Sequence, residues 1–401
     1  MKKLMILAAA VAVLTVSCRE EATPFEEEPQ IIPKIYLSWD RPEELRALNV
    51  YLGFEKSDLT TEEVEELYHN SARLMIPYKG IVKMLKSPSQ PTETQIQALI
   101  RNLQMDSLYC DFTELKNSLN YFLLKGRPVC VDIHEFIGYF LYTNEANDAR
   151  DSSLFISAYK QILLKEFELQ LAGFLERNYA QQVEDGNICL ELLNEPKSDR
   201  WEDIQKDLAQ AISAKFPKLC LAVRPDQSYS PNCLRATWFD PADYRNIRHL
   251  TFVNFWFAER PDIGASPMDF AIQYDKFVRY RNGEDVEFNL FGDLITGYYS
   301  HRDYALNQQL LEEEFQMCVD WANNQGEKIF FAELGCIRYA DPDGQYFLNC
   351  LKLGQEYDIG IGLFEVGAQY FFNYDGDVPF YLNDKSWTGF QYLQMDPAEL
   401  N

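Results

Sequence analysis

The feature that most constrains the fold is a regular alternation of short apolar runs with longer helix-like segments. The apolar runs are continuous, which is expected of strands buried on both faces of a parallel sheet. They span residues 34–39, 72–76, 128–133, 188–193, 219–223, 249–255, 328–332 and 359–364. Helical patterns at 112–124, 157–179, 201–215, 305–323 and 346–357 lie between them. Eight such strands in one domain predict a TIM (β/α)8 barrel of the α/β class.

Two of the predicted strands end at a glutamate. Glu195 lies in the stretch ELLNEP, and Glu333 lies in IFFAELG. In a barrel of this type, the carboxyl ends of the strands carry the chemistry, and a retaining glycoside hydrolase needs two carboxyl groups there. Glu191, deeper on the same strand as Glu195, needs a partner when buried, and Arg73 on the second predicted strand is the candidate. We expect that pair to be structural.

The motifs ELLNEP and AELG, with VDIH on the third predicted strand, resemble glycoside hydrolase family 5, the cellulase- and mannanase-like members of clan A. The resemblance covers roughly residues 35–395. It implies that a single barrel domain hydrolyses a β-linked glycan by double displacement. In that reading Glu195 is the general acid/base, Glu333 is the nucleophile, Asn194 binds the sugar 2-hydroxyl, and His134 lines the subsite near the scissile bond.

The chain also departs from the family pattern. Asn254 and Trp256 stand where the family has a His-x-Tyr pair, and Arg73 lies two residues before the usual arginine position. With Glu365 and Tyr370, which follow the eighth predicted strand, they complete the expected substrate-binding set, since aromatic faces stack on sugar rings. The departures keep a second hypothesis open, a non-catalytic glycan-binding lipoprotein of the cell surface with a degenerate hydrolase site.

The amino terminus has the pattern of an export signal. Lys2 and Lys3 precede an apolar stretch that ends at Ser17-Cys18, which resembles a bacterial lipoprotein signal with Cys18 as the lipidated residue. A plain secretory signal is the alternative. The residues after Cys18 resemble the export tag of Bacteroidota surface lipoproteins, which implies an outer-membrane lipoprotein exposed to the outside. We predict a signal peptide at 1–17, an acidic disordered tether at 18–34, and the hydrolase-like barrel at 35–401.

Composition limits the partners. A net charge of −25 disfavours nucleic acid and anionic membrane surfaces, while a neutral polysaccharide or oligosaccharide is compatible with it. We therefore expect a monomer that meets the membrane only through its lipid anchor. No cofactor is expected, and no His or Cys spacing suggests a metal site. The cysteines allow disulfides in an oxidising compartment, yet Cys130, Cys189 and Cys220 lie in apolar runs and are expected to be buried free thiols.

Overall fold

The computed structural model describes the barrel strands and the main helices around them. The described residues are 31–53, 64–77, 80–81, 84–86, 109–136, 158–196, 201–225, 233–234, 239–256, 308–335, 344–366, 390–396 and 399. The predicted signal peptide and the predicted tether up to residue 30 lie outside the described residues.

Eight parallel strands close into a barrel, which confirms the predicted fold class. The strands are β1 (Arg46–Tyr51), β2 (Ser71–Ile76), β5 (Val129–Ile133), β6 (Ile188–Glu191), β7 (Cys220–Val223), β8 (His249–Trp256), β9 (Ile329–Gly335) and β10 (Gly360–Val366). Around the barrel they run β1-β10-β9-β8-β7-β6-β5-β2. A short antiparallel pair, β3 (Leu85–Lys86) and β4 (Tyr109–Cys110), lies outside this sheet.

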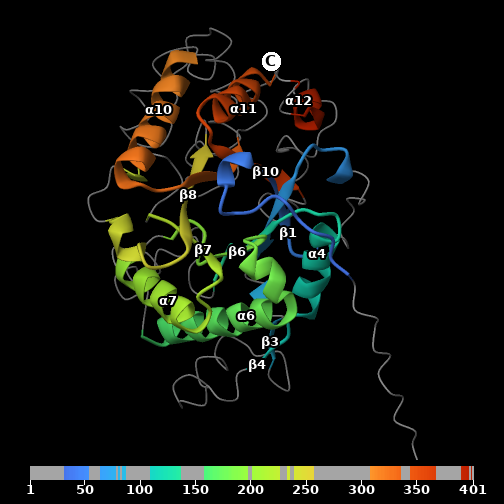
Figure 1. Cartoon of the computed structure of the whole chain (residues 1–401), viewed down its shortest axis with the longest axis vertical. Helices are drawn as coiled ribbons and strands as arrows, with labels where there is room; N and C mark the ends of the chain where they lie inside the picture. The colour runs from blue at the N-terminus through green and yellow to red at the C-terminus, as the bar shows by residue number, and fades with distance from the viewer. Residues whose placement is uncertain are drawn as a thin grey trace, which may run out of the picture.

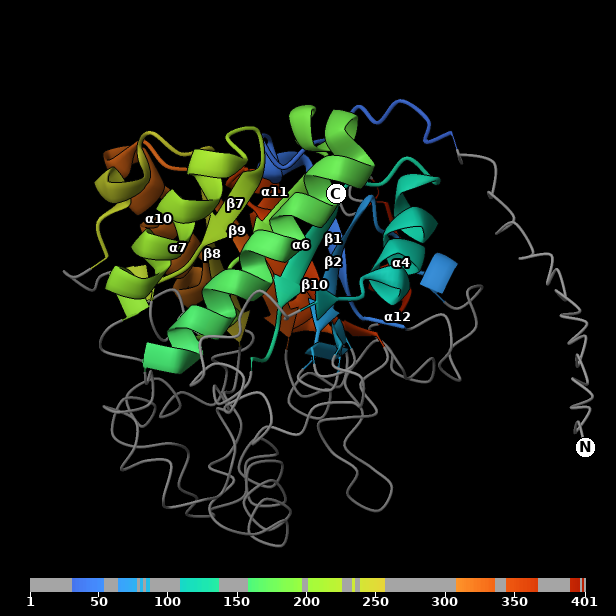
Figure 2. The same ribbon diagram turned by 90° about the horizontal axis from the view of Figure 1, so that it is seen from below.

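The helices surround the barrel (Figures 1 and 2). They are α4 (Thr113–Leu123), α6 (Ala158–Glu184), α7 (Trp201–Lys215), α10 (Gln308–Gln325), α11 (Gln345–Glu356) and α12 (Phe390–Gln394), with short 3-10 turns η1 (Pro42–Glu44) and η5 (Pro241–Tyr244). Five helices thus match the predicted helical patterns to within a few residues. Helix α6 runs past its predicted end, with non-helical dihedral angles at Tyr179. None of the described helices has the length and apolar character needed to cross a bilayer.

The predicted first strand at 34–39 is wrong. Strand β1 begins at Arg46 instead, and its apolar pattern was hidden by Arg46 and Asn49, which are both buried. The 34–39 segment has no regular structure, but it brings Trp39 against the rings of Phe252 and Phe330, at centroid distances of 5.8 and 5.2 Å. The indole therefore belongs to the core inside the barrel, near the amino ends of the strands.

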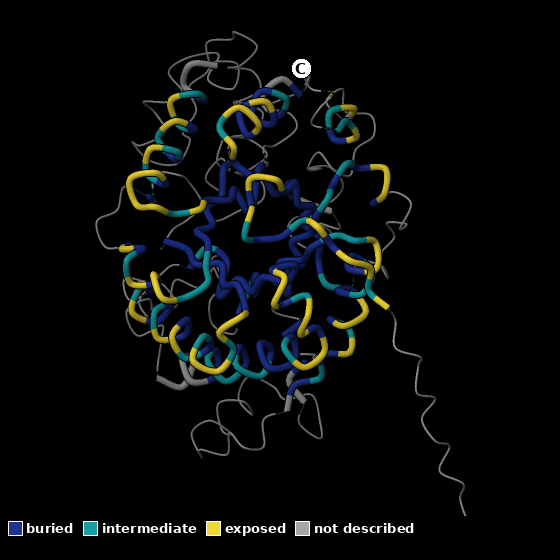
Figure 3. Tube along the Cα trace, viewed as in Figure 1, coloured by how far each residue is buried: buried dark blue, intermediate teal, exposed yellow. Residues whose placement is uncertain are grey.

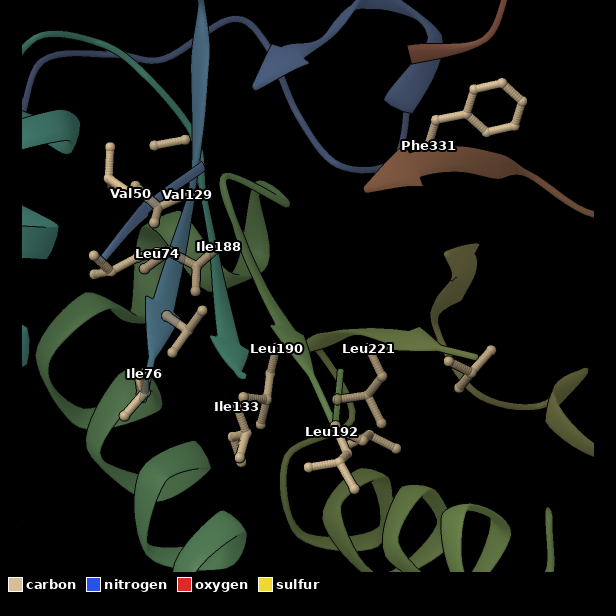
Figure 4. Close-up of a cluster of buried hydrophobic side chains, with 14 of the residues drawn as sticks. Val50, Leu74, Ile76, Val129, Ile133, Ile188, Leu190, Leu192, Leu221 and Phe331 are labelled. Atoms are coloured by element: carbon tan, nitrogen blue, oxygen red, sulfur yellow. The ribbon is translucent and has the colours of Figure 1, made fainter. Parts of the chain in front are cut away.

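Because side chains alternate along a strand, the barrel has an inner and an outer apolar layer. The inner layer consists of Trp39, Leu45, Ala47, Cys130, Cys189, Cys220, Ala222, Leu250, Phe252, Phe330 and Ala332. The outer layer packs strands against helices; Figure 4 labels Val50, Leu74, Ile76, Val129, Ile133, Ile188, Leu190, Leu192, Leu221 and Phe331 from it. Figure 3 shows the strands as a buried ring inside partly exposed helices. Burial of each large apolar side chain is worth about 1.5–3 kcal/mol.

The cysteine prediction is confirmed for the inner layer. Cys130 lies opposite Cys189, and Cys189 lies opposite Cys220, on three neighbouring strands. All three are buried free thiols, as are most of the other cysteines in the described residues. Burial raises the pKa of the Cys189 thiol well above its usual value, so this thiol has little thiolate character and serves as packing.

Candidate active site

A fully buried arginine organises the polar end of the barrel. Arg73 on β2 donates from Nε and Nη2 to the two carboxylate oxygens of Glu191, at 2.7 and 3.0 Å. Its Nη1 donates to Oε1 of Glu333 at 2.8 Å, and its Nη2 donates to Oδ1 of Asn194 at 2.9 Å and lies 2.9 Å from Asp132. The predicted Arg73–Glu191 pair is present, and the same guanidinium also joins the two candidate catalytic strands.

The charges around Arg73 offset its burial. Burial disfavours its charge, but Asp132, Glu191 and Glu333 hold the pKa of Arg73 well above its usual value. Burial also raises the pKa of a carboxyl group, yet Arg224 and Arg73 outweigh it and lower the pKa of Glu191. Glu191 is therefore an ionised structural anion between two arginines, which agrees with the expected structural role.

Glu333 points into the barrel because β9 contains an irregularity. Val253 of β8 pairs with Phe331, while the next residue of β8, Asn254, pairs with Glu333. The extra residue lets both Ala332 and Glu333 face the interior, although side chains of a regular strand alternate. Burial raises the pKa of Glu333 and the Glu195 charge raises it further, whereas Arg73 and His134 oppose that rise.

Glu195 lies beyond the end of β6 in an unusual backbone conformation. Its φ of 39° is in the left-handed region, which is uncommon for a residue with a side chain. Its Oε1 accepts a hydrogen bond from Nδ2 of Asn254 at 2.6 Å. The preceding residue, Asn194, is tied to β5 through its backbone N–H and the carbonyl of Ile133 at 3.0 Å. The half-buried Glu195 carboxyl is thus held near enough to Glu333 for its charge to act on that group.

His134 directly follows β5 and lies beside the second glutamate. Its Nδ1 is 2.9 Å from Oδ2 of Asp132 and 3.9 Å from Oε1 of Glu333. Burial lowers its pKa, but Asp132 and Glu333 outweigh burial and raise the pKa of His134 to about 9. The ring therefore carries a positive charge at neutral pH, and it lies edge-on to Tyr51 at 5.7 Å.

Six predicted site residues meet in one connected network: Arg73, His134, Asn194, Glu195, Asn254 and Glu333. The structure does not describe the side chains of the other four predicted site residues. The backbones of Trp256 and Glu365 lie in β8 and β10, but their side chains are not described, and Tyr370 and Cys18 lie outside the described residues altogether. Within the described chain, no group of three or more His, Cys, Asp or Glu is arranged to hold a metal ion.

Sequence reasoning missed three members of the network. Asp132 lies inside the VDIH motif, but only its histidine was considered. Arg224 directly follows a predicted strand, and a basic residue at that position was an available signal. Asn49, which donates to the backbone carbonyls of Ala332 and Leu363 at 2.9 and 3.1 Å and accepts from Arg73 at 2.8 Å, was hidden because the first strand was misplaced.

Comparisons with known proteins agree with this architecture. No protein-family model matches the sequence, and no curated protein matches it. Among solved structures, 151 chains match. One is an endoglucanase, with a TM-score of 0.52 and 13% identity over 81% of this chain and 90% of that one. Another is the cellulose synthase subunit Z (CcsZ) of Clostridioides difficile, with a TM-score of 0.52 and 15% identity over 81% and 92% of the two chains.

A third similar structure is a tri-modular family 5, subfamily 4, endo-β-1,4-glucanase from Bacillus licheniformis. It has a TM-score of 0.52 and 13% identity over 82% of this chain and 56% of that one. At such identities the likeness concerns the fold. The chain therefore has a barrel like that of family 5 cellulases, which confirms the predicted resemblance at the level of the fold.

Proposed function

We propose that this protein is a retaining glycoside hydrolase that cleaves a β-linked glycan with Glu195 and Glu333. The observation that carries the proposal is that two glutamates near the carboxyl ends of β6 and β9 belong to one network. Arg73 donates to Glu333, and the charge of Glu195 acts on Glu333. A retaining hydrolase needs two carboxyl groups in one site, one as the acid and one as the ionised nucleophile.

The surroundings of the two glutamates suit different roles. Arg73 donates to Glu333 and the charged His134 lies close by, and both oppose the rise that burial gives to the pKa of Glu333. A carboxylate held in this way is oriented for attack on a sugar C1. Glu195 is less buried, and among the described residues a neutral amide contacts its Oε1. In this proposal its other oxygen exchanges a proton with substrate and water.

The proposed reaction proceeds in two steps. Glu195 gives its proton to the glycosidic oxygen as the bond to C1 breaks, and a Glu333 oxygen forms the new bond to C1. The aglycone leaves with that proton. Glu195, now ionised, takes a proton from a water whose oxygen attacks C1 and releases Glu333 as a carboxylate. Asn194, whose Oδ1 is fixed by Arg73, binds the sugar 2-hydroxyl in this proposal.

The first substrates to test are β-1,4-glucans and other β-glycans, because similar solved structures carry the description endo-β-1,4-glucanase. Purified protein is incubated with a glycan panel and with an activated aryl β-cellobioside. Glu333→Gln is expected to abolish turnover. Glu195→Ala is expected to lose about 100- to 10,000-fold on unactivated glycans, and azide should rescue its turnover of the activated aryl glycoside by attacking C1 of the glycosyl-enzyme. Glu184→Gln, a change of an exposed glutamate on α6, is the control and keeps full activity.

Retention is tested by following the first-formed anomer by NMR, which should be the β anomer. Turnover that persists in Glu333→Gln, or an inverted product, would contradict the proposal. The second candidate function is glycan binding without hydrolysis. It is favoured by Asn254, which replaces a titratable family residue with an amide. Sugar binding by the wild type with no hydrolysis anywhere on the panel would establish that alternative.

We also propose that the protein is an outer-membrane lipoprotein anchored through Cys18 and exposed at the cell surface. The amino-terminal sequence supports this, because a short apolar run precedes the cysteine and an acidic stretch follows it. Labelling with a radioactive fatty acid should mark the wild type and not Cys18→Ser. Protease treatment of intact cells should then remove the barrel domain, and full protection would argue against surface exposure.

A further inference from the structure

Arg224 is a fully buried arginine that the proposed reaction does not use directly. It directly follows β7, the fifth strand of the barrel along the chain. Its Nε donates to Oε1 of Glu191, and its Nη1 donates to Oδ1 of Asn254 at 3.0 Å. Asn254 in turn donates to Glu195. Arg224 is therefore linked to the candidate acid/base, Glu195, through Asn254.

The backbone of Arg224 is held in place by helix α7. Its N–H donates to Oε1 of Gln205 at 2.7 Å, and its carbonyl accepts from Nε2 of Gln205 at 2.9 Å and from Nε1 of Trp201 at 3.0 Å. The guanidinium also lies over the ring of Phe252, with 5.8 Å between Cζ and the ring centroid. The backbone of Arg224 is thus held by α7 and its guanidinium by Glu191 and Phe252, which fixes the position of Nη1.

The contacts of Asn254 settle the orientation of its amide. A guanidinium has donors only, so the group facing Arg224 is the Asn254 oxygen. The NH2 group then faces Glu195, whose Oε1 lies 2.6 Å away. An amide NH2 has no lone pair to accept a proton, so Oε1 of Glu195 acts as an acceptor there. A proton carried by Glu195 therefore sits on Oε2.

We infer that Arg224 and Asn254 are positioning residues, which fix Oε1 of Glu195 as a permanent acceptor and leave Oε2 as the oxygen that donates and recovers the proton. This inference rests on the proposed function. Asn254 contributes a fixed donor and no titratable proton, since its side chain is an amide. The hydrogen bond from Asn254 also supports Glu195 in its left-handed backbone conformation, which is unfavourable for a residue with a side chain.

Leaving-group dependence tests the inference, because poor leaving groups need the acid and activated ones do not. Asn254→Asp keeps an acceptor for Arg224 but replaces the donor to Glu195 with a like charge. We expect kcat/KM to fall by about 100-fold or more on an unactivated β-glycan and by less than about 10-fold on the dinitrophenyl glycoside. Arg224→Lys should change the same ratio in the same direction, because a lysine lacks the fork that reaches Glu191 and Asn254 together.

Two controls alter similar groups at the other end of the barrel. Asn187→Asp removes a buried amide donor to the carbonyl of Leu37, and Arg248→Lys weakens a pair with Asp40. Both should lower thermal stability without changing the ratio between the two substrates. If Arg224→Lys does not fold, Asn254→Asp and Asn254→Ala test the inference by themselves, since both leave the pair between Arg224 and Glu191 in place.

The outcomes separate the two levels of the proposal. If wild-type hydrolysis depends on both glutamates, yet the Asn254 variants slow both substrates equally, the inference is wrong and the proposed function stands. If no substrate is hydrolysed in a way that depends on Glu195 and Glu333, the proposed function fails and the inference fails with it. A selective loss on the unactivated substrate, absent from the control variants, supports both.

Discussion

Glu168 on α6 offers a prediction about stability that does not depend on the proposed activity. Its side chain is fully buried, and neither carboxyl oxygen has a hydrogen-bond partner among the described residues. Burial raises the pKa of Glu168 well above its usual value of 4.5. The folded protein therefore holds a proton on Glu168 at pH values where the unfolded chain has lost it.

The sign of the pH effect follows from that difference. Above pH 4.5 the folded state binds more protons than the unfolded state, so this group makes the free energy of unfolding fall as pH rises. The slope is at most about 1.4 kcal/mol per pH unit. Glu168→Gln, which cannot ionise, should match the wild type near pH 4 and become progressively more stable than it above pH 5.

Glu168→Met should be more stable than the wild type at every pH, because it also removes the buried polar group. Burying a polar group without a partner costs about 1–3 kcal/mol. The unfolding entropy of a chain of 401 residues is about 0.8 kcal/mol per kelvin. A gain of that size therefore raises Tm by about 1–4 °C.

Differential scanning calorimetry from pH 4 to 8 measures both variants, with Glu166→Gln as the control. Glu166 is on the same helix, two residues away, and is partly exposed. Because this side chain is partly exposed, its substitution should change Tm little. The reasoning is refuted if Glu168→Gln and the wild type keep the same Tm difference across the whole range.

The remaining predictions concern two histidines and a glycine. Burial lowers the pKa of His69 to about 4, so the folded protein loses stability as pH falls from 6.5 to 4. In urea titrations, the free energy of unfolding of His69→Phe should fall by about 3 kcal/mol less between pH 7 and pH 4 than that of the wild type. The raised pKa of His134 means that its proton stabilises the fold below pH 6.5, and this contribution is lost as pH rises through about 9. An NMR titration of the ring should have its midpoint near pH 9, and Asp132→Asn should lower that midpoint. A Cβ on Gly362 would lie 2.1 Å from a β9 carbonyl oxygen, so Gly362→Ala should yield insoluble protein. Gly173→Ala on α6 is the control and should stay soluble, because the nearest atom to its Cβ is a flexible arginine tip at 3.0 Å.

Seven of the eight strands were predictable because each is a local pattern. A strand buried on both faces needs a continuous apolar run, and such runs are visible in any window of five or six residues. The exception is β1, where the polar residues Arg46 and Asn49 break the apolar pattern although both are buried. Asn49 is accepted inside the barrel only because Ala332, Leu363 and Arg73 satisfy its amide.

The candidate site was predictable where a short motif marks a strand end. Glu195 and Glu333 each follow an apolar run, and Arg73 was matched to Glu191 because a buried carboxylate needs a cation. The inward direction of Glu333 was not predictable, since it depends on an extra residue in β9 that appears only when β8 and β9 pair. The same holds for the orientation of Asn254, which is set by Arg224 on another strand.

The sequence by itself determined seven of the eight barrel strands, five helices and the two acids at strand ends, because apolar periodicity and short motifs act within a few neighbouring residues. The tertiary structure alone decided which polar groups meet. Arg73 contacts Glu191 and Glu333 across 118 and 260 positions of the chain. Residues so far apart in the chain come into contact only when the strands form a barrel in one register. A charge that is buried in this way then needs a partner of opposite charge.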